Sequence, residues 1–267
     1  MKSILKKLFL GNLSKIEKPE YNPVQKRIQN IKAIWNNNHQ NDNGIEKLVR
    51  LFLSSSQLLF PGVYIKYLAY LAGYEYRDLA LDFYVLLKVA FPLLILIYHW
   101  QSYHLVIWIM IYVLLETVLY IPTLIFASDM ISRPRSYKRS MLLLFFNYVE
   151  IIFSFAVLYS CGNYLNQPFH HWFDAIYFST INSASIGYGD FYPVTTKGRF
   201  LATAQAFLFL FFVVLFLNFF TTKIKTKGYF DNENEWTKVL TKKKETNWFP
   251  FLNIISFFWY RRLFQLR

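Results

Sequence analysis

Four long apolar stretches dominate the pattern of hydrophobic and polar positions along the chain. They cover residues 79–100, 104–127, 141–161 and 199–222. None of them has the polar face that a helix shows on the surface of a soluble protein. Each is long enough to cross a bilayer, which takes about 20 mostly apolar residues. The pattern therefore predicts an all-α membrane protein with four transmembrane helices.

A further apolar stretch, residues 51–76, is interrupted by Ser54–Gln57, Pro61–Gly62 and Lys66. Interruptions of this kind are typical of helices that lie at the membrane interface or enter the membrane without crossing it. We therefore expect interfacial or re-entrant helices here, and a fifth span is the alternative.

Basic residues are concentrated at the two ends of the chain and in one short loop. The loop at residues 132–140 contains four of them: Arg133, Arg135, Lys138 and Arg139. The turn at residues 101–103 has no charged residue. Because lysine and arginine favour the cytoplasmic side of a membrane, both termini and the basic loop are predicted to be cytoplasmic. A fifth span would move the lysine-rich N-terminus to the outside, which is an argument against it.

Composition narrows the class of protein. Of the 267 residues, 55% are apolar, 21% are aromatic and only 17% are charged, which excludes a disordered chain, a collagen and an ordinary soluble enzyme. The net charge of +13 lies in the tails and the loop, so it does not indicate nucleic-acid binding. The single cysteine, Cys161, excludes a disulfide framework within the chain. We expect no enzymatic activity and no cofactor.

The segment between the third and fourth stretches, residues 168–200, is too short and too polar at its end to cross the membrane and return as two full helices. Its first part is apolar enough for a buried half-helix over residues 169–183. Pro168 suits the first turn of that helix, and Asp174 suits the positive end of its dipole. The segment then continues as Ser-Ile-Gly-Tyr-Gly-Asp at residues 185–190.

The two glycines of this hexapeptide allow an unusual backbone. Gly187 and Gly189 accept positive φ angles at little steric cost. A strand that alternates between left- and right-handed conformations turns successive carbonyl oxygens to one side. Such a row of oxygens, contributed by several chains, could replace the hydration shell of a potassium ion.

Residues 185–190, SIGYGD, resemble the TVGYGD selectivity filter of the potassium channel family. Ala175–Ser179 resembles the family's pore helix, Asp190–Arg199 resembles its outer mouth, and the resemblance covers roughly residues 141–222. It implies a homotetramer in a lipid bilayer that binds K⁺ at four residues: Ser185, Ile186, Gly187 and Tyr188. It also implies that three residues support the filter: Gly189, Asp190 and Tyr177.

The sequence departs from the family's pattern at three positions. Ser185 and Ala184 stand where threonine is common, and Ile181 stands where some members have an acidic residue. Their effect on selectivity stays open. The fourth apolar stretch, residues 199–222, corresponds to the inner helix of that family. It has no glycine after Gly198 and no Pro-x-Pro motif, so the sequence does not locate a gate.

Three charged residues lie inside the apolar stretches: Lys88, Glu116 and Glu150. Counting 1.5 Å per residue from the uncharged turn places Lys88 and Glu116 at the same depth, about 18 Å from it. We expect an ion pair between them, with Glu150 close by or protonated. The cluster is interpreted mainly as a clasp between helices and secondarily as a sensor. One basic residue in the first two spans is too few for steep voltage dependence.

These observations divide the chain into five regions: a cytoplasmic or interfacial N-terminal region (1–78), a transmembrane hairpin (79–127), a basic cytoplasmic linker (128–140), a pore domain (141–222) and a basic, interfacial cytoplasmic tail (223–267). The predicted function is a potassium-selective channel of the plasma membrane that conducts K⁺ passively. The alternatives are a subunit of a potassium uptake transporter and a non-conducting membrane adaptor.

Overall fold

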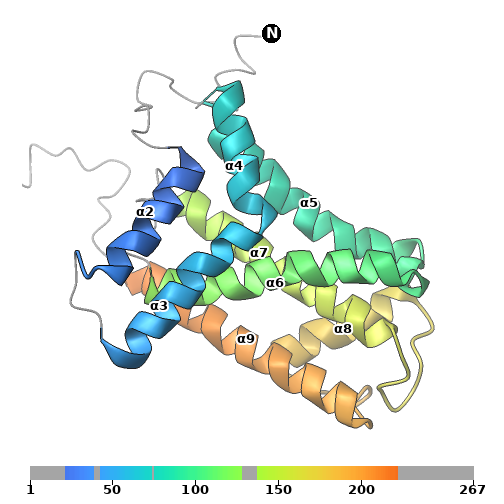
Figure 1. The fold of residues 1–267 in the computed structure, drawn as a ribbon. Coiled ribbons are helices and arrows are strands. Elements are labelled where there is room, and N and C mark those ends of the chain that lie inside the picture. The colour runs from blue at the N-terminus through green and yellow to red at the C-terminus, as the bar shows by residue number, and fades with distance from the viewer. Residues whose placement is uncertain (1–21, 39–42, 74, 128–136, 222–267) are drawn as a thin grey trace, which may run out of the picture. The chain divides into compact units, whose positions relative to one another are not determined.

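The computed structural model describes residues 22–38, 43–73, 75–127 and 137–221, and it is built from helices (Figure 1). Within these residues no β-strand forms, apart from one isolated bridge between Leu165 and Pro193. The helices are α2 (Pro23–Trp35), α3 (Gly44–Ser56), α4 (Pro61–Ala72), α5 (Arg77–Ile97), α6 (His104–Phe126), α7 (Tyr137–Ser160), α8 (Trp172–Ser183) and α9 (Thr196–Thr221). Two short 3₁₀ turns, η2 (Gln57–Leu59) and η3 (Trp100–Ser102), complete them.

Four of these helices, α5, α6, α7 and α9, are long and apolar enough to cross a membrane. They correspond to the four predicted stretches, so the prediction of an all-α membrane protein is confirmed, and each of the four stretches forms one long helix. The contacts described below lie within one compact unit, Met1–Phe219. The predicted tail at residues 223–267 lies outside the described residues, as do Arg133 and Arg135.

The third span begins earlier than its apolar residues suggest. Helix α7 starts at Tyr137, so Lys138 and Arg139 lie in its first turn and not in a loop. The Arg139 guanidinium is 2.6 Å from the Asp82 carboxylate and 3.7 Å from that of Asp78, both on α5. These ion pairs stabilise a charged first turn that hydropathy alone assigns to the linker.

The stretch predicted as interfacial or re-entrant forms two helices, α3 and α4, that meet at a bend of 58°. The backbone N–H of Gly62, in the first turn of α4, donates to Glu116 Oε1 on α6 at 3.0 Å. Glu116 is twelve residues into α6, about 18 Å from the start of the helix. The bend therefore lies level with the middle of a spanning helix, which favours a re-entrant pair or a broken fifth span over a helix confined to the interface.

The short helix α8 packs against α7 (Figure 1). Helix α7 contacts α5 on one side and the short helix α8 on another, and α4 contacts α5. Ala175, Ile176 and Phe178 on α8 are buried against apolar residues of the neighbouring helices. A half-length helix is thus held among full-length spans, as the sequence predicts for residues 169–183.

Candidate functional site

The start of the half-helix α8 is fixed by reciprocal side-chain caps. His171 Nδ1 accepts from the backbone N–H of Phe173 at 3.2 Å, and Asp174 Oδ2 accepts from the N–H groups of His170 and His171 at 3.0 and 2.9 Å. This is a capping box. The helix therefore starts at Trp172, and the prediction that Pro168 occupies its first turn is wrong, because the cap that satisfies the free N–H groups lies three residues later.

The segment after α8 has an alternating backbone. Ser185, Gly187 and Gly189 have φ angles of +55°, +60° and +86°, while Ile186 and Tyr188 between them do not have positive φ. Alternation of this kind turns successive carbonyl groups toward one side of the segment. The sequence indicated positive φ at the two glycines but not at Ser185, because a non-glycine residue rarely adopts positive φ.

Hydrogen bonds from the end of α8 hold Ser185 in this conformation. The N–H of Ser185 donates to the Asn182 carbonyl at 3.2 Å, and the N–H of Ile186 donates to the Ile181 carbonyl at 3.0 Å. The first two residues of the segment are thus attached to the last turn of the half-helix. The position of Ser185 therefore depends on the position of that turn.

The rest of the segment is open in a single copy of the chain. Ile186 is 53% exposed and Tyr188 is 71% exposed. A Cβ atom added at Gly187 or Gly189 would meet no atom within 4 Å. Within one chain, only the positive φ angle therefore restricts these two positions to glycine.

The C-terminal end of the segment is held by two amide side chains that the sequence analysis did not identify. Asn166 Nδ2 and Gln167 Nε2 donate to the Asp190 carbonyl at 3.0 and 3.2 Å, and the N–H of Tyr192 donates to Asn166 Oδ1 at 2.9 Å. The run of polar residues just after α7 is the feature of the sequence that could have indicated these contacts.

The Asp190 side chain forms a hydrogen bond with Tyr177 on α8. This hydrogen bond is the main reason that the pKa of the Tyr177 phenol is raised.

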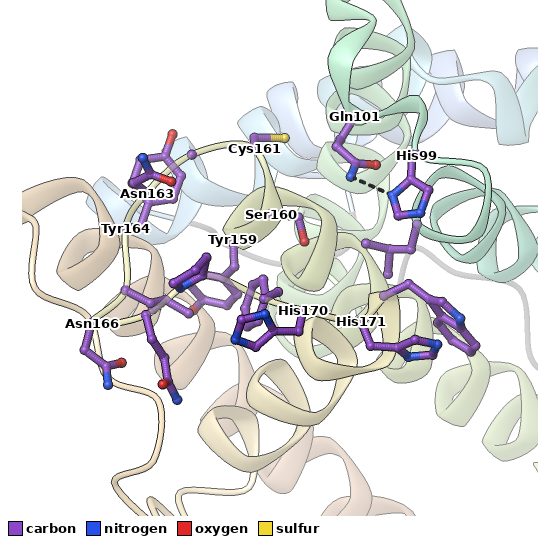
Figure 2. A pocket seen from close by; sticks show the side chains of 17 residues that line it. His99, Gln101, Tyr159, Ser160, Cys161, Asn163, Tyr164, Asn166, His170 and His171 are labelled. Atoms are coloured by element: carbon purple, nitrogen blue, oxygen red, sulfur yellow. Dashed lines mark hydrogen bonds between the residues drawn. The ribbon is translucent and has the colours of Figure 1, made fainter.

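A cavity of about 690 Å³ lies at the C-terminal ends of α5 and α7, beside the start of α8 (Figure 2). His99, His170 and His171 line it together with Cys161. The Cys161 thiol donates to the Val157 carbonyl at 3.2 Å. Among the residues that the structure describes, no group of three or more His, Cys, Asp or Glu side chains could hold a metal ion.

The three charged residues predicted inside the spans lie together between α5, α6 and α7. Lys88 Nζ is 3.2 Å from Glu150 Oε2 and 4.0 Å from Glu116 Oε2. The nearer partner of Lys88 is therefore Glu150, whereas the sequence suggested Glu116. Lys88 is 6% exposed and Glu150 1% exposed, and Glu116 is 16% exposed at its side chain.

Neutral groups complete this charged network. Thr117 Oγ1 accepts from Lys88 and donates to Glu150 Oε2, the latter at 2.8 Å. Glu116 accepts from the Tyr84 hydroxyl as well as from the backbone of α4. The network thus connects the start of α4 to both helices of the hairpin and to α7. Thr117 had not been identified from the sequence.

Comparison with known proteins adds a family assignment for part of the chain. Residues 143–226 match the family model described as "Ion channel". A search of curated proteins and a search of solved structures found no match. The matched residues include α8, the alternating segment and α9. Together with the four spanning helices, they make this chain an all-α integral membrane protein that carries an ion channel domain.

Proposed function

We propose that the chain is one subunit of a potassium-selective channel. The observation that carries this proposal is the alternating backbone of residues 185–189, with positive φ at Ser185, Gly187 and Gly189. Carbonyl oxygens that face one side can take the place of the water around K⁺. In this proposal the ion is coordinated by Ser185, Ile186, Gly187 and Tyr188, and Gly189, Asp190 and Tyr177 support them.

One chain supplies only one wall of such a path. An ion needs oxygens on all sides, and potassium filters are built from four equivalent loops. The exposure of Ile186 and Tyr188 supports this arrangement, because these side chains are left for contacts with neighbouring copies. We therefore propose a homotetramer around a central axis.

The half-helix α8 adds an electrostatic contribution. It has 12 residues, and its last turn bonds directly to the first residues of the filter. The carboxyl end of a helix carries a partial negative charge, which stabilises a cation that lies just beyond that end. Asp174 at the opposite end stabilises the partial positive charge there.

The remaining parts of the proposal concern topology and chemistry. The basic residues of the tails and of the linker favour a topology with both termini in the cytoplasm. The membrane in this proposal is the plasma membrane. Ions would move passively down their gradient, with no enzymatic step and no cofactor.

The test is flux of K⁺ and Na⁺ through the purified full chain in liposomes. We expect K⁺ to pass and Na⁺ to be largely excluded, and Gly187→Ala to remove this preference. Gly44→Ala is the matched control, because Gly44 has φ +59° and equally open space but lies at the start of α3. Both substitutions carry the same backbone strain, so only the place of the glycine differs.

Other outcomes would support the alternatives. Flux that requires an energy source would indicate a subunit of a potassium uptake transporter, and protein without any cation flux would indicate a membrane adaptor. Selectivity that survives Gly187→Ala would contradict the proposed role of the alternating backbone.

A further inference from the structure

A buried network of neutral hydrogen bonds centres on Gln205 of α9. Its Nε2 donates to the carbonyl and to the Oγ of Ser179 on α8, at 2.9 and 2.8 Å. Its Oε1 accepts from the Tyr159 hydroxyl on α7 at 2.9 Å and from Asn182 Nδ2 on α8 at 2.8 Å. One side chain thus joins all three helices of the ion channel domain.

This arrangement uses the full hydrogen-bonding capacity of the amide. A glutamine side chain has two N–H donors and one oxygen that accepts two hydrogen bonds, and all four are occupied here. Gln205 is 1% exposed and Ser179 is fully buried, so no water competes for these bonds. Turning the amide over would place its N–H₂ group against that of Asn182, so the amide can form all of its hydrogen bonds in only one orientation.

The network continues into the first residue of the filter. Asn182 bonds to Gln205 through its side chain and accepts from the N–H of Ser185 through its carbonyl. Only Asn182 therefore separates the amide of Gln205 from Ser185. Because Ser185 holds an unfavourable positive φ of +55°, its conformation depends on the turn of α8 to which it is attached.

From these contacts we infer that Gln205 is a positioning residue that fixes the position and rotation of the last turn of α8. Through that turn it also fixes the position of Ser185, the ion-coordinating residue nearest to α8. The inference rests on the proposed potassium channel function. It assigns to helix α9 a part in ion selectivity.

The test replaces Gln205 by methionine, which has a similar length but lacks the hydrogen-bond donors and the acceptor of the amide. The replacement removes one hydrogen bond each from the Ser179 carbonyl, the Tyr159 hydroxyl and the Asn182 amide. Asn182 Nδ2 keeps its longer contacts with the Tyr159 hydroxyl at 3.3 Å and the Ala202 carbonyl at 3.5 Å. We expect the loss to shift the last turn of α8 and to lower the K⁺ to Na⁺ permeability ratio by about tenfold or more. The ratio is measured from reversal potentials of the reconstituted full chain, so it does not depend on how many channels assemble.

Thr203→Val is the matched control on the same helix. The Thr203 hydroxyl donates only to the Arg199 carbonyl of its own helix, at 2.9 Å, so its loss should leave the ratio unchanged. Tyr159→Phe removes one of the four bonds of Gln205 and should lower the ratio by a smaller factor than Gln205→Met.

The outcomes separate this inference from the function on which it rests. A selective wild-type channel together with an assembled Gln205→Met variant of equal selectivity would overturn the inference alone. If Gln205→Met fails to assemble, Tyr159→Phe decides, and an unchanged ratio in that variant would overturn the inference. A wild-type chain that passes Na⁺ as readily as K⁺ would overturn the proposed function first.

Discussion

Two buried polar networks connect the helices of this chain, and they differ in charge. The network around Gln205 joins α7, α8 and α9 with neutral groups only. The network around Lys88 joins α5, α6 and α7, and it contains one positive and two negative side chains. In the neutral network every hydrogen-bonding position of the central amide is occupied, whereas Glu150 Oε1 of the charged network is buried without a hydrogen-bond partner.

The difference follows from where each network lies. Tyr159 and Glu150 are nine residues apart on α7, about 14 Å along the helix, and the network that contains Tyr159 is the one attached to the candidate filter. A fixed charge beside a cation path would attract or repel the ion itself, but neutral amides can hold the path without doing so. Charge is tolerable between the hairpin and α7, where the network serves to join helices. This comparison predicts that one network governs selectivity and the other governs assembly.

The largest expected effect comes from Lys88→Met. This change leaves two carboxylates in an apolar environment without a counter-charge, which we expect to cost about 3–5 kcal/mol of stability and to reduce assembly severely. The measurement is the melting temperature and the yield of assembled protein in detergent. Lys197→Met, at an exposed position early in α9, is the control and should change neither quantity.

A second substitution identifies the true partner of Lys88. Lys88→Met combined with Glu150→Gln should recover more stability than Lys88→Met combined with Glu116→Gln. The reason is that Glu150 is both nearer to the lysine, at 3.2 Å against 4.0 Å, and more deeply buried. Equal recovery by the two glutamines would contradict the assignment of Glu150 as the main partner.

A smaller loss of stability, about 1–3 kcal/mol, is expected for Gln205→Met, because it removes hydrogen bonds between neutral groups and leaves no charge unpaired. The same variant should nevertheless change ion selectivity, whereas assembled protein with Lys88→Met and Glu150→Gln should keep the wild-type permeability ratio. Thermal stability and reversal potentials measured on both variants test whether selectivity depends on the Gln205 network and not on the Lys88 network. A similar loss of selectivity in both would show that the two networks are not functionally separate.

The sequence alone predicted the features that depend on one segment at a time. The four long helices follow from long, mostly apolar runs, and the alternating backbone of residues 185–189 follows in part from the spacing of Gly187 and Gly189. The positive φ of Ser185 was not predicted, because this conformation is held by hydrogen bonds to the preceding helix and not by the residue's own preference. The start of α8 was misplaced because the His171 and Asp174 cap outweighs the preference of Pro168 for a first turn.

Features that depend on how helices are rotated against each other could not be predicted in the same way. Counting residues gave the common depth of Lys88 and Glu116. It could not show which faces of α5, α6 and α7 meet, and this rotation makes Glu150 the nearer partner. The same reason explains why Gln205 was not recognised: a single polar residue in an apolar helix has no visible partner until three helices are packed together.

A moderate effect is expected where α4 begins, at Gly62→Ala. A Cβ atom there would overlap Glu116 Oε1, the atom that accepts the hydrogen bond from the Gly62 N–H. The carboxylate can move only by weakening its contacts with Tyr84 and Lys88, so we expect a loss of about 1–2 kcal/mol, measured as a lower melting temperature. The control is the same change in a Glu116→Ala background, where no carboxylate is left to overlap and Gly62→Ala should cause no such loss. An unchanged melting temperature in Gly62→Ala would show that α4 is not anchored through Glu116.

The smallest effect is expected for Thr117→Val, which removes the bridging hydroxyl of the charged network and keeps its volume. The hydroxyl accepts from Lys88 and donates to Glu150 Oε2, but these two charged groups also contact each other directly at 3.2 Å. The ion pair therefore survives, and we expect a loss of only about 1 kcal/mol in melting experiments, with no change in selectivity. A loss as large as that of Lys88→Met would mean that the hydroxyl, and not the direct contact between opposite charges, holds the hairpin to α7. The network would then depend on hydrogen bonds in the same way as the one around Gln205, and charge would no longer be what distinguishes the two.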